Sequence, residues 1–579
     1  MLGSMLFAGL IVVAPQATPV ERFAAKELAA GLERVTGEAQ TVVTEDPGTG
    51  VRYLVGGDPL GEAPWKTDEI RLVRKDGRII LTGDRARGAL YAVNEYLERY
   101  VGVRWWTKDE ADYPRRPDFQ PPAALDVRYA PPFAYREALY HGPLSDAAFK
   151  VRMKCNVTSK TRYILPPTVE DFIPPEMGGD HRLVFFKGRR SSYHSFFEVL
   201  PPEKWFGTHP EWYGFDPKKG ERVKRQLCVT DEAMAEEYIR ETLRLLRESP
   251  DCDSIQVSQN DGKGPCECPK CRAFMEAEGA WSGPYLAFVN KVAAAIEKEF
   301  PDVMVDTFAY QFTRKAPKTV RPRRNVLVRL CDIECFFNRP LAASPADWTP
   351  NAAFVDDLVA WSRLAEGRLY LWDYQANFQS YMMPHPNLHV FADNIRLFRR
   401  YGAVGVFEQG DAMCPTGDFA ALKQYVTAHL LWNPDLDWTV LRDEFLDGYY
   451  GPAAGSLRRV LEVVERSATA TGCPGMRCYH REAAPWISDD AARAALADME
   501  SALAAAQKAG EPYVRRVRAA KLSWDHARIV HWDLWKQSGD RAATVRDWIR
   551  SLEDFKVNAY CETTTRKTLE DYLKKLVAE

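Results

Sequence analysis

The sequence predicts a multidomain α/β protein with a central (β/α)8 TIM barrel, a small N-terminal α+β domain and an all-helical C-terminal domain. Three observations support this prediction. A chain of 579 residues is too long for one compact domain. Its middle part alternates short apolar strands with helical segments, and its last part has long helical segments and few strands. We place the domains at residues 1–125, 126–425 and 426–579.

The first 125 residues follow the pattern β-α-β-β-β-α. Thr18 and Glu21 form a capping box around Pro19, and apolar residues recur at helical spacing until Gly37, which predicts a helix. We expect strands at residues 51–55, 70–73 and 79–81, the last two joined by a hairpin turn at 75–78. A second helix is expected at residues 86–100. Prolines between residues 114 and 132 favour extended backbone and predict a link to the barrel.

The barrel prediction rests on eight short apolar segments, each followed by a loop and a helical stretch. The expected strands span residues 133–139, 155–160, 226–230, 254–259, 303–310, 325–330, 368–373 and 403–408. The helix after the fourth strand begins at Ser282 and ends before Pro301. An open α/β sheet is the alternative, but no glycine-rich phosphate loop follows any strand, which argues against nucleotide binding.

After about residue 420, helical segments rich in Ala, Leu, Arg and Glu dominate, for example 489–508 and 513–536. We therefore expect the C-terminal domain to consist of packed helices.

Composition excludes several function classes. Lys and Arg total 77 against 80 Asp and Glu, a net charge of −3, so no long-range field attracts nucleic acid or anionic membranes. The apolar stretch Met5–Ala14 is too short to span a bilayer and lacks the basic residues that open a signal peptide. GxSxG, HExxH and Walker motifs are absent, which argues against a serine hydrolase, a metalloprotease and an NTPase.

Aromatic residues make up 12% of the chain, with 16 Trp and 25 Tyr. Flat rings with a polar edge suit concave sites for amphipathic ligands such as sugars, although many of these rings fill cores. The aromatic content is therefore compatible with a sugar ligand.

Carboxylates at the ends of predicted strands are the candidate catalytic groups, because barrel active sites lie at the carboxyl ends of strands. Hydrolysis of a glycosidic bond requires two converging carboxyl groups. Asp373 and Glu408 end adjacent strands and are the first choice. Asp261 and Glu334 are candidates for the opposite role, and the sequence does not choose between them. Glu334 or the nearby Asp332 could instead orient an arginine.

Other polar and aromatic residues near the strand ends are candidates for substrate binding. A guanidinium near the end of the first strand could pair with a substrate carboxylate or with a barrel acid. Imidazole, carboxylate and aromatic groups before the third strand suit sugar hydroxyls and ring faces. The candidates are Arg136, His194, His209, Glu211, Trp212, Tyr213, Asn260, Tyr310, Asp332, Trp372 and Tyr374.

Three cysteines, Cys266, Cys268 and Cys271, lie within six residues. With a fourth thiol from Cys228 or Cys252 they fit a closed tetrahedral zinc site, which would be structural because thiolate-rich sites are usually closed. A disulfide in an exported protein and free thiols are the alternatives. No cofactor is expected for catalysis.

Several motifs surround the predicted strand ends, namely Gln259–Gly262 with Cys266–Cys271, Asp306–Gln311, Leu371–Tyr374 and Glu408–Gly410. In these motifs the chain resembles a known bacterial family, the domain-of-unknown-function family 4838. In front of them, Gly83–Trp106 resembles the small domain that precedes the barrel in α-glucuronidases and β-N-acetylhexosaminidases. Behind them, Leu431–Pro434 and Tyr449–Gly451 resemble the helical domain that follows the barrel in such enzymes.

This resemblance implies an exo-acting glycoside hydrolase, either α-glucuronidase-like or hexosaminidase-like, exported to the periplasm or secreted by bacteria that degrade complex glycans. Substrate-assisted hexosaminidases carry two neighbouring acids after strand four, where this chain has Asn260 and Asp261. In α-glucuronidases two bases come from late strands, to which Asp373 and Glu408 correspond. A glycan-binding protein that uses a TIM-barrel scaffold without catalysis is the alternative function.

Overall fold

The computed structural model describes residues 9–46, 52–157, 173–179, 193–248, 252, 254–262, 264–342, 349–562 and 566–578. The chain divides into two compact units. The first consists of Met1–Thr158, Asp171–His181 and Ala421–Leu436, and the second of Ser159–Glu170, Arg182–Ala420 and Asp437–Glu579. The three predicted domains do not coincide with these units, and their boundaries stay a prediction.

A six-stranded mixed sheet forms the core of the first unit. Its strands, in spatial order, are β2 (Thr41–Val43), β1 (Leu10–Val13), β3 (Arg52–Val55), β5 (Arg78–Gly83), β4 (Ile70–Lys75) and β8 (Asp126–Tyr129). β1 runs parallel to β2 and β3, β3 runs parallel to β5, and β4 is antiparallel to β5 and β8. β8 lies inside the proline-rich segment, so this segment completes the sheet and is not the expected link.

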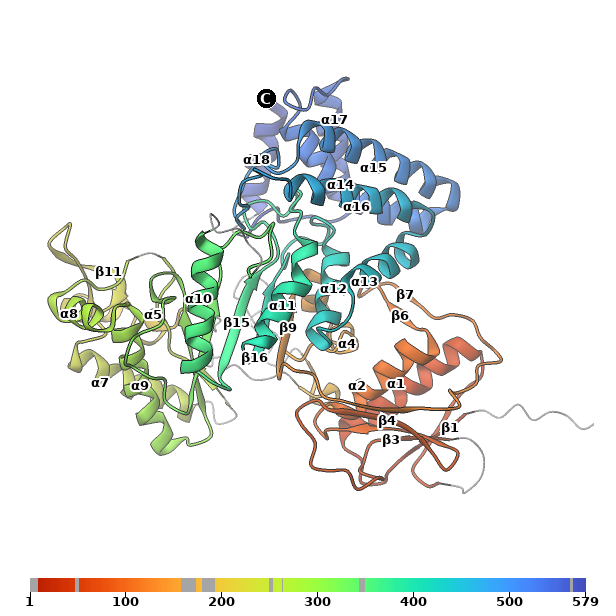
Figure 1. Cartoon of the computed structure of the whole chain (residues 1–579), viewed down its shortest axis with the longest axis horizontal. Helices are drawn as coiled ribbons and strands as arrows, with labels where there is room; N and C mark the ends of the chain where they lie inside the picture. The colour runs from red at the N-terminus through yellow and green to blue at the C-terminus, as the bar shows by residue number, and fades with distance from the viewer. Residues whose placement is uncertain are drawn as a thin grey trace, which may run out of the picture. The chain divides into compact units, whose positions relative to one another are not determined.

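Two helices pack on this sheet, α1 (Pro19–Thr36) and α2 (Gly88–Tyr96), and Figure 1 shows them side by side. The capping box is confirmed, because Glu21 N donates to Thr18 Oγ1 at 3.2 Å and Thr18 N donates to Glu21 Oε2 at 2.7 Å. Gly37 ends the helix with a φ of 79°. α2 continues into one π-helical turn, η1 (Leu97–Val101).

The remaining elements of the first unit are short. They are β6 (Arg104–Trp105), β7 (Ala111–Asp112), β9 (Tyr135–Leu139), α3 (His141–Ser145), α4 (Ala147–Arg152), η2 (Pro175–Met177) and most of α12 (Ala420–Trp432).

The second unit contains five parallel strands of a six-stranded sheet. In sequential order they are β12 (Ser254–Gln256), β13 (Met304–Ala309), β14 (Val326–Cys331), β15 (Leu369–Tyr374) and β16 (Ala403–Gln409). Each strand pairs with the next along the chain, as in a barrel wall, whereas the strand order of a doubly wound sheet reverses. The strands therefore form a half-barrel.

A complete eight-stranded barrel is not seen in the described residues. Residues 226–230 were expected to form a barrel strand, but β11 (Glu221–Leu227) pairs antiparallel with β10 (Tyr213–Asp216) in a separate hairpin. Residues 155–157 have no regular structure, and residues 158–160 lie outside the described residues. β11 carries four charged residues, Glu221, Arg222, Lys224 and Arg225, as suits a solvated hairpin. The predicted strand began only at Gln226, after these charges, so its short apolar run did not distinguish the end of a hairpin from a barrel strand.

Helices follow most strands of the half-barrel. α9 (Ser282–Glu299) packs on β13 and β14, α11 (Phe391–Arg400) packs on β16, and Figure 1 shows α10 (Thr349–Leu364) and α11 beside β15 and β16. The other elements in this part are α5 (Phe196–Val199), α6 (Pro202–Trp205), η3 (Pro210–Trp212), α7 (Glu232–Arg247), α8 (Pro269–Glu278), η4 (Gln311–Thr313) and η5 (Leu388–Val390).

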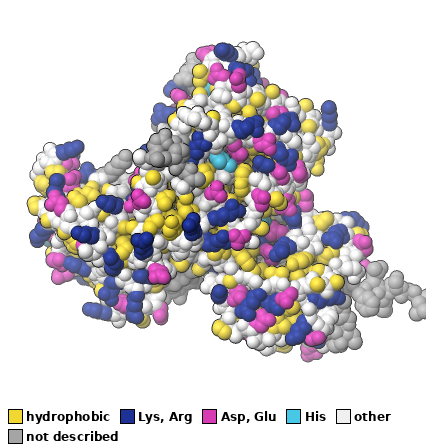
Figure 2. Space-filling view, in the orientation of Figure 1, with side chains coloured by type: hydrophobic (Ala, Val, Ile, Leu, Met, Phe, Trp, Pro, Cys, Tyr) yellow, Lys and Arg dark blue, Asp and Glu magenta, His cyan; other side chains and the backbone are white. Residues whose placement is uncertain are grey.

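The last part of the chain is helical, as predicted. It consists of α13 (Trp438–Phe445), η6 (Leu446–Tyr450), η7 (Gly451–Ala453), α14 (Ala454–Ala468), α15 (Asp489–Ala509), α16 (Glu511–Val530), α17 (Arg541–Asp554) and α18 (Arg566–Ala578). None of the helices in the described residues has the length and apolar character needed to cross a membrane. Basic and acidic side chains are interspersed on the face drawn in Figure 2, consistent with a net charge of −3.

Candidate functional site

The two faces of the half-barrel sheet differ in chemistry. Successive side chains of a strand point to opposite faces, so Trp372 and Asp373 of β15 lie on different faces. Asp373 interacts with Asn394 of α11, which identifies its face as the one that helices cover. Trp372 is half-buried and packs against Tyr193 and Phe407, with ring centroids 4.8 and 4.4 Å apart. We call these the helix-covered face and the open face.

Three carboxyl groups meet on the helix-covered face. Asp332 directly follows β14, and Asp373 and Glu408 occupy paired positions on β15 and β16. Each is at most 2% exposed. Burial raises the pKa of all three, that of Asp373 to about 6, and the negative charge of Asp373 raises the pKa of Asp332 and Glu408 further.

Within the described part of the chain, the buried side-chain oxygens of Asp332 and Glu408 have no hydrogen bond of ordinary geometry, and both side chains interact most strongly with the carboxyl group of Asp373. No basic side chain balances the cluster there. Asp332 and Glu408 therefore retain protons at neutral pH and can donate them to Asp373, whose pKa of about 6 makes it the carboxyl group that ionises first.

The open face carries a first polar cluster at the ends of β12 and β13. Asp261 is exposed, and Tyr310 Oη donates a hydrogen bond of 3.0 Å to its Oδ1. Gln311 Nε2 donates to Tyr310 Oη at 2.8 Å. His194 lies beside them, with Nδ1 2.8 Å from the carbonyl oxygen of Gln259. Burial and the charge of Asp261 raise the pKa of Tyr310, so this phenol stays a neutral donor.

A second polar cluster lies at the end of β16. Gln409 Nε2 donates to Glu562 Oε1 at 3.1 Å, and Trp372 Nε1 donates to Gln409 Oε1 at 2.9 Å. Tyr479 Oη donates to Glu562 Oε2 at 2.7 Å, so both carboxylate oxygens are held. Burial and the charge of Glu562 raise the pKa of Tyr479. The ring of Phe308 lies 5.7 Å from that of Trp372 and 5.9 Å from that of Tyr310, so it connects the two clusters.

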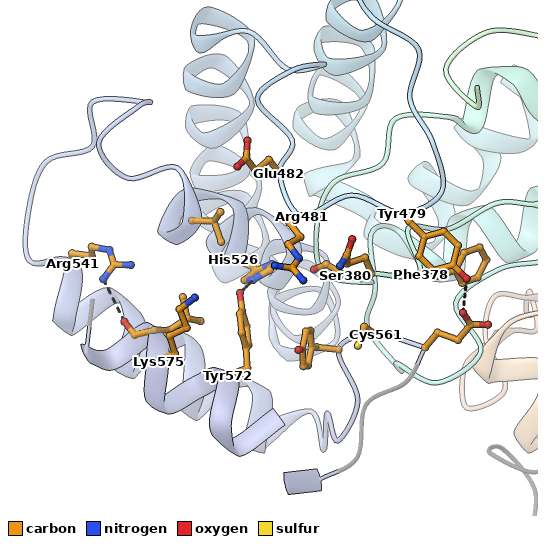
Figure 3. A pocket seen from close by; sticks show the side chains of 15 residues that line it. Phe378, Ser380, Tyr479, Arg481, Glu482, His526, Arg541, Cys561, Tyr572 and Lys575 are labelled. Atoms are coloured by element: carbon orange, nitrogen blue, oxygen red, sulfur yellow. Dashed lines mark hydrogen bonds between the residues drawn. The ribbon is translucent and has the colours of Figure 1, made fainter. Parts of the chain in front are cut away.

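A cavity of about 570 Å³ adjoins Glu562 (Figure 3). Figure 3 shows the hydroxyl of Tyr479 directed at the carboxylate at one end of the cavity. The walls combine aromatic rings with cationic side chains, namely Phe378, Tyr479, Tyr560 and Tyr572 with Arg481, Arg541 and Lys575. This size and lining are typical of a small-molecule site.

His526 also lines the cavity, where it hydrogen-bonds to Tyr572 Oη. Burial lowers the pKa of His526 to about 4, so the ring is neutral at physiological pH. The cationic charge on the cavity wall therefore comes from arginine and lysine alone among the described lining residues.

Four cysteines form a separate buried cluster. The Sγ atoms of Cys228, Cys266, Cys268 and Cys271 all lie within 4.8 Å of one another, and all four thiols are free. Cys228 directly follows β11, and Cys271 lies in the first turn of α8. This set includes Cys228 and not Cys252, which resolves the choice that the sequence left open. A cluster of this kind can hold a metal ion.

Residues 105–462, well over half of the chain, match the family described as "Domain of unknown function (DUF4838)". The chain belongs to this family. No curated protein matches it.

The solved structures that resemble this family member are glycoside hydrolases. A family GH115 4-O-methyl-α-glucuronidase with specificity for decorated arabinogalactans has a TM-score of 0.58 at 12% identity, with 98% of this chain and 77% of that chain covered. A GH138 enzyme targeting pectin rhamnogalacturonan II has a TM-score of 0.45 at 10% identity and 98% coverage of both chains. A family 89 glycoside hydrolase from Clostridium perfringens has a TM-score of 0.44 at 10% identity, with 92% of this chain and 65% of that chain covered. At this identity the GH115 likeness shows the fold alone.

Several candidates from the sequence lie on the open face of this family member. His194, Asp261, Tyr310 and Trp372 belong to the two polar clusters. Tyr374 is on the same face as Trp372, and their rings stack at 6.1 Å.

The carboxyl pair that the sequence favoured lies on the other face. Asp373 and Glu408 come together as expected, but they are buried under helices and do not line the open face. Asp332 joins them. Strand alternation turns them away from the open face, and their catalytic role stays a prediction. Glu334 lies apart, in an ion pair of 3.1 Å with Arg314.

Other candidates have structural contacts. Arg136 is fully buried in the first unit, where Nη2 lies 2.8 Å from Asp68 Oδ2 and Nε and Nη1 donate to backbone carbonyls. Of the two alternatives that the sequence left open, the structure thus favours a carboxyl group of the protein, although this group is Asp68 and not a barrel acid. Asn260 bonds reciprocally with Gln226. The candidates at residues 209–213 lie in and just before the β10–β11 hairpin. The ring of His209 stacks on that of Trp212, with centroids 4.0 Å apart, and its Nδ1 hydrogen-bonds to Glu211. Tyr213 Oη donates to the carbonyl oxygen of Leu200.

Four residues of the open-face clusters escaped prediction, Gln311, Gln409, Tyr479 and Glu562. Gln409 follows Glu408 in a motif that was recognised, and strand alternation could have identified it as the residue on the opposite face. Tyr479 and Glu562 come from loops of the helical part, and no sequence pattern connects them to the strand ends.

Proposed function

We propose that this protein is a glycoside hydrolase that acts on an oligosaccharide or glycoconjugate bound to the open face. The observation that carries this proposal is the pair of carboxylates, Asp261 and Glu562, each held by a tyrosine hydroxyl on the same face of a barrel-type sheet. In barrel enzymes the active site lies at the carboxyl ends of the strands, and the two polar clusters that contain Asp261 and Glu562 lie there. Hydrolysis of a glycosidic bond uses two such groups.

The contacts of the two carboxylates suit different roles. Tyr479 and Gln409 fix both oxygens of Glu562, which orients this carboxylate to stabilise positive charge at the anomeric carbon or to activate water. Tyr310 Oη and Gly262 N both donate to Oδ1 of Asp261, which leaves Oδ2 for proton exchange with the leaving oxygen. Trp372 offers a half-exposed ring for a sugar face.

The cavity beside Glu562 supports exo action. Its volume of about 570 Å³ suits the end of a glycan chain better than a long stretch of polysaccharide. Arg481 and Lys575 on its wall favour an acidic sugar, since cationic side chains pair with carboxylates.

The test compares four proteins on a panel of glycans that end in uronic acid, N-acetylhexosamine, sialic acid or neutral sugars. Wild type, Asp261→Asn, Glu562→Gln and the matched control Asp373→Asn are incubated with each glycan, and released monosaccharides are identified by mass spectrometry. We expect wild type and Asp373→Asn to release one kind of sugar, and the other two variants to lose release at least 100-fold.

Two results would contradict this assignment. Loss of release in Asp373→Asn with full release in Asp261→Asn and Glu562→Gln would make the buried carboxyl cluster the catalytic centre. Binding of a glycan by wild type without release of any sugar from it would identify a glycan-binding protein instead.

A further inference from the structure

We infer that Cys228, Cys266, Cys268 and Cys271 bind one Zn²⁺ ion and that this ion fastens the loop carrying Asp261 to the hairpin β10–β11. The cluster lies outside the proposed catalytic groups, and the metal proposal does not depend on the proposed function.

Sulfur separations match a tetrahedral metal site. Cys228 Sγ lies 3.6 Å from Cys268 Sγ and 4.0 Å from Cys271 Sγ. With zinc–sulfur bonds of about 2.3 Å, tetrahedral geometry places sulfurs about 3.8 Å apart. A disulfide requires about 2.05 Å between its sulfurs, so the four thiols are arranged around a common centre and not as bonded pairs.

The surroundings of the cluster stabilise thiolates, which are the form that binds zinc. Phe215 N donates to Cys266 Sγ at 3.4 Å, and Arg222 Nη1 donates to the same sulfur at 3.7 Å. Thr230 Oγ1 lies 3.1 Å from Cys271 Sγ. Cys271 also lies at the N-terminal end of α8, where the helix dipole favours negative charge.

The site is closed. Cys266 and Cys271 have no exposed surface, and Cys228 and Cys268 are 3% and 5% exposed. Four sulfurs complete the coordination of zinc, and burial leaves no room for water or substrate, as in structural zinc sites. Four thiolates buried together without a cation would be costly, which is the physical reason to expect the ion.

The ion would join parts of the chain that meet near Asp261. Gln226 of β11 holds the backbone of Asn260 through two hydrogen bonds, of 2.8 Å from Gln226 Nε2 and of 3.0 Å to Gln226 Oε1. Cys228 follows two residues later, and its bond to zinc would tie the end of β11 to α8. The same strand is thus fixed to the loop of Asn260 and Asp261 on one side and to the metal on the other.

Metal analysis of the full-length chain tests the site directly. Protein purified without chelators is analysed for bound metals by mass spectrometry, together with Cys268→Ser and a matched control, Cys473→Ser, whose thiol lies outside the cluster. We expect one zinc per chain in wild type and control and at least a tenfold loss in Cys268→Ser.

A second measurement uses the wild-type protein alone, so its result does not depend on whether Cys268→Ser folds. Wild type stripped of metal and titrated with Co²⁺ should develop thiolate-to-cobalt charge-transfer absorption at one equivalent. Hydrogen exchange should then be slower in β11 and α8 with metal than without, while α15 serves as an unchanged reference. Absence of both native zinc and cobalt uptake, or a disulfide among the four cysteines in freshly purified protein, would overturn the proposal, whether or not the protein hydrolyses glycans.

Discussion

Asp373 and Glu408 occupy paired positions on adjacent parallel strands, yet both side chains lie under helices, while their neighbours Trp372 and Phe407 pack together on the open face. A shift of one residue along either strand would exchange the faces. Each strand end therefore places residues on both faces of the sheet. One face holds the buried carboxyl cluster, and the other holds aromatic and amide groups.

The buried carboxyl cluster predicts a pH dependence of stability. Burial raises the folded-state pKa of Asp373 to about 6, above its ordinary value of 3.8. A carboxyl group whose pKa is higher in the folded than in the unfolded protein stabilises the folded state at low pH. This stabilisation is fully present below the pKa of the unfolded state and is lost as the pH rises through the pKa of the folded state. Resistance to urea should thus fall between about pH 4 and about pH 6, by up to about 1.4 kcal/mol per pH unit for the proton of Asp373, and this contribution is lost above pH 6.

Urea unfolding at a series of pH values measures this slope. Asp373→Asn keeps the shape of the side chain but does not titrate, so it should flatten the dependence. Glu366→Gln, at an exposed position, should keep the wild-type slope. Equal slopes in wild type and Asp373→Asn would show that the cluster does not retain its protons.

Removal of one hydroxyl tests the first open-face cluster. Tyr310→Phe loses the hydrogen bond to Asp261 and retains the ring. A hydrogen bond to a charged group contributes about 1.5–3 kcal/mol, so kcat/KM for the released sugar should fall roughly 10- to 100-fold. Tyr53→Phe, which removes a buried hydroxyl in the first unit, should leave kcat/KM unchanged. A fall of the same size in both variants would indicate a general loss of folding.

Trp372 allows stacking and hydrogen bonding to be separated. Trp372→Phe keeps an aromatic ring but removes the donor to Gln409, whereas Trp372→Ala removes both. If the ring packs on a sugar face, Trp372→Ala should raise KM roughly 2- to 10-fold above that of Trp372→Phe, the range expected for aromatic packing. Equal KM values for the two variants would assign the residue to orientation of Gln409 alone.

The buried ion pairs of the first unit predict a large stability effect. Asp68 pairs with Arg136 at 2.8 Å and with Arg87 at 2.7 Å, and Asp68 and Arg136 have no exposed surface. Asp68→Asn leaves two buried guanidinium groups without their counter-charge and should destabilise the protein by about 3–5 kcal/mol. Asp126→Asn removes an exposed partner of Arg71 and should cost at most about 1 kcal/mol. Thermal unfolding compares the two, and similar midpoints would refute the distinction.

Local patterns predicted most elements well. The capping box at Thr18 and Glu21 specifies its helix through contacts within four residues, and the apolar runs of β13 to β16 predict strands because buried strands need them. The hairpin β10–β11 was misread since strand pairing depends on residues far apart in sequence.

The sequence by itself determined the family, the alternation of strands and helices in the middle of the chain, the helical C-terminal part and the three clustered cysteines. These features depend on composition and on short-range spacing. Only the tertiary structure decided which face each carboxylate occupies, that Cys228 completes the sulfur cluster, and that Glu562 lies beside Gln409. These contacts join residues far apart in the sequence, 40 positions for Cys228 and Cys268 and 153 for Gln409 and Glu562, and no local pattern encodes their geometry.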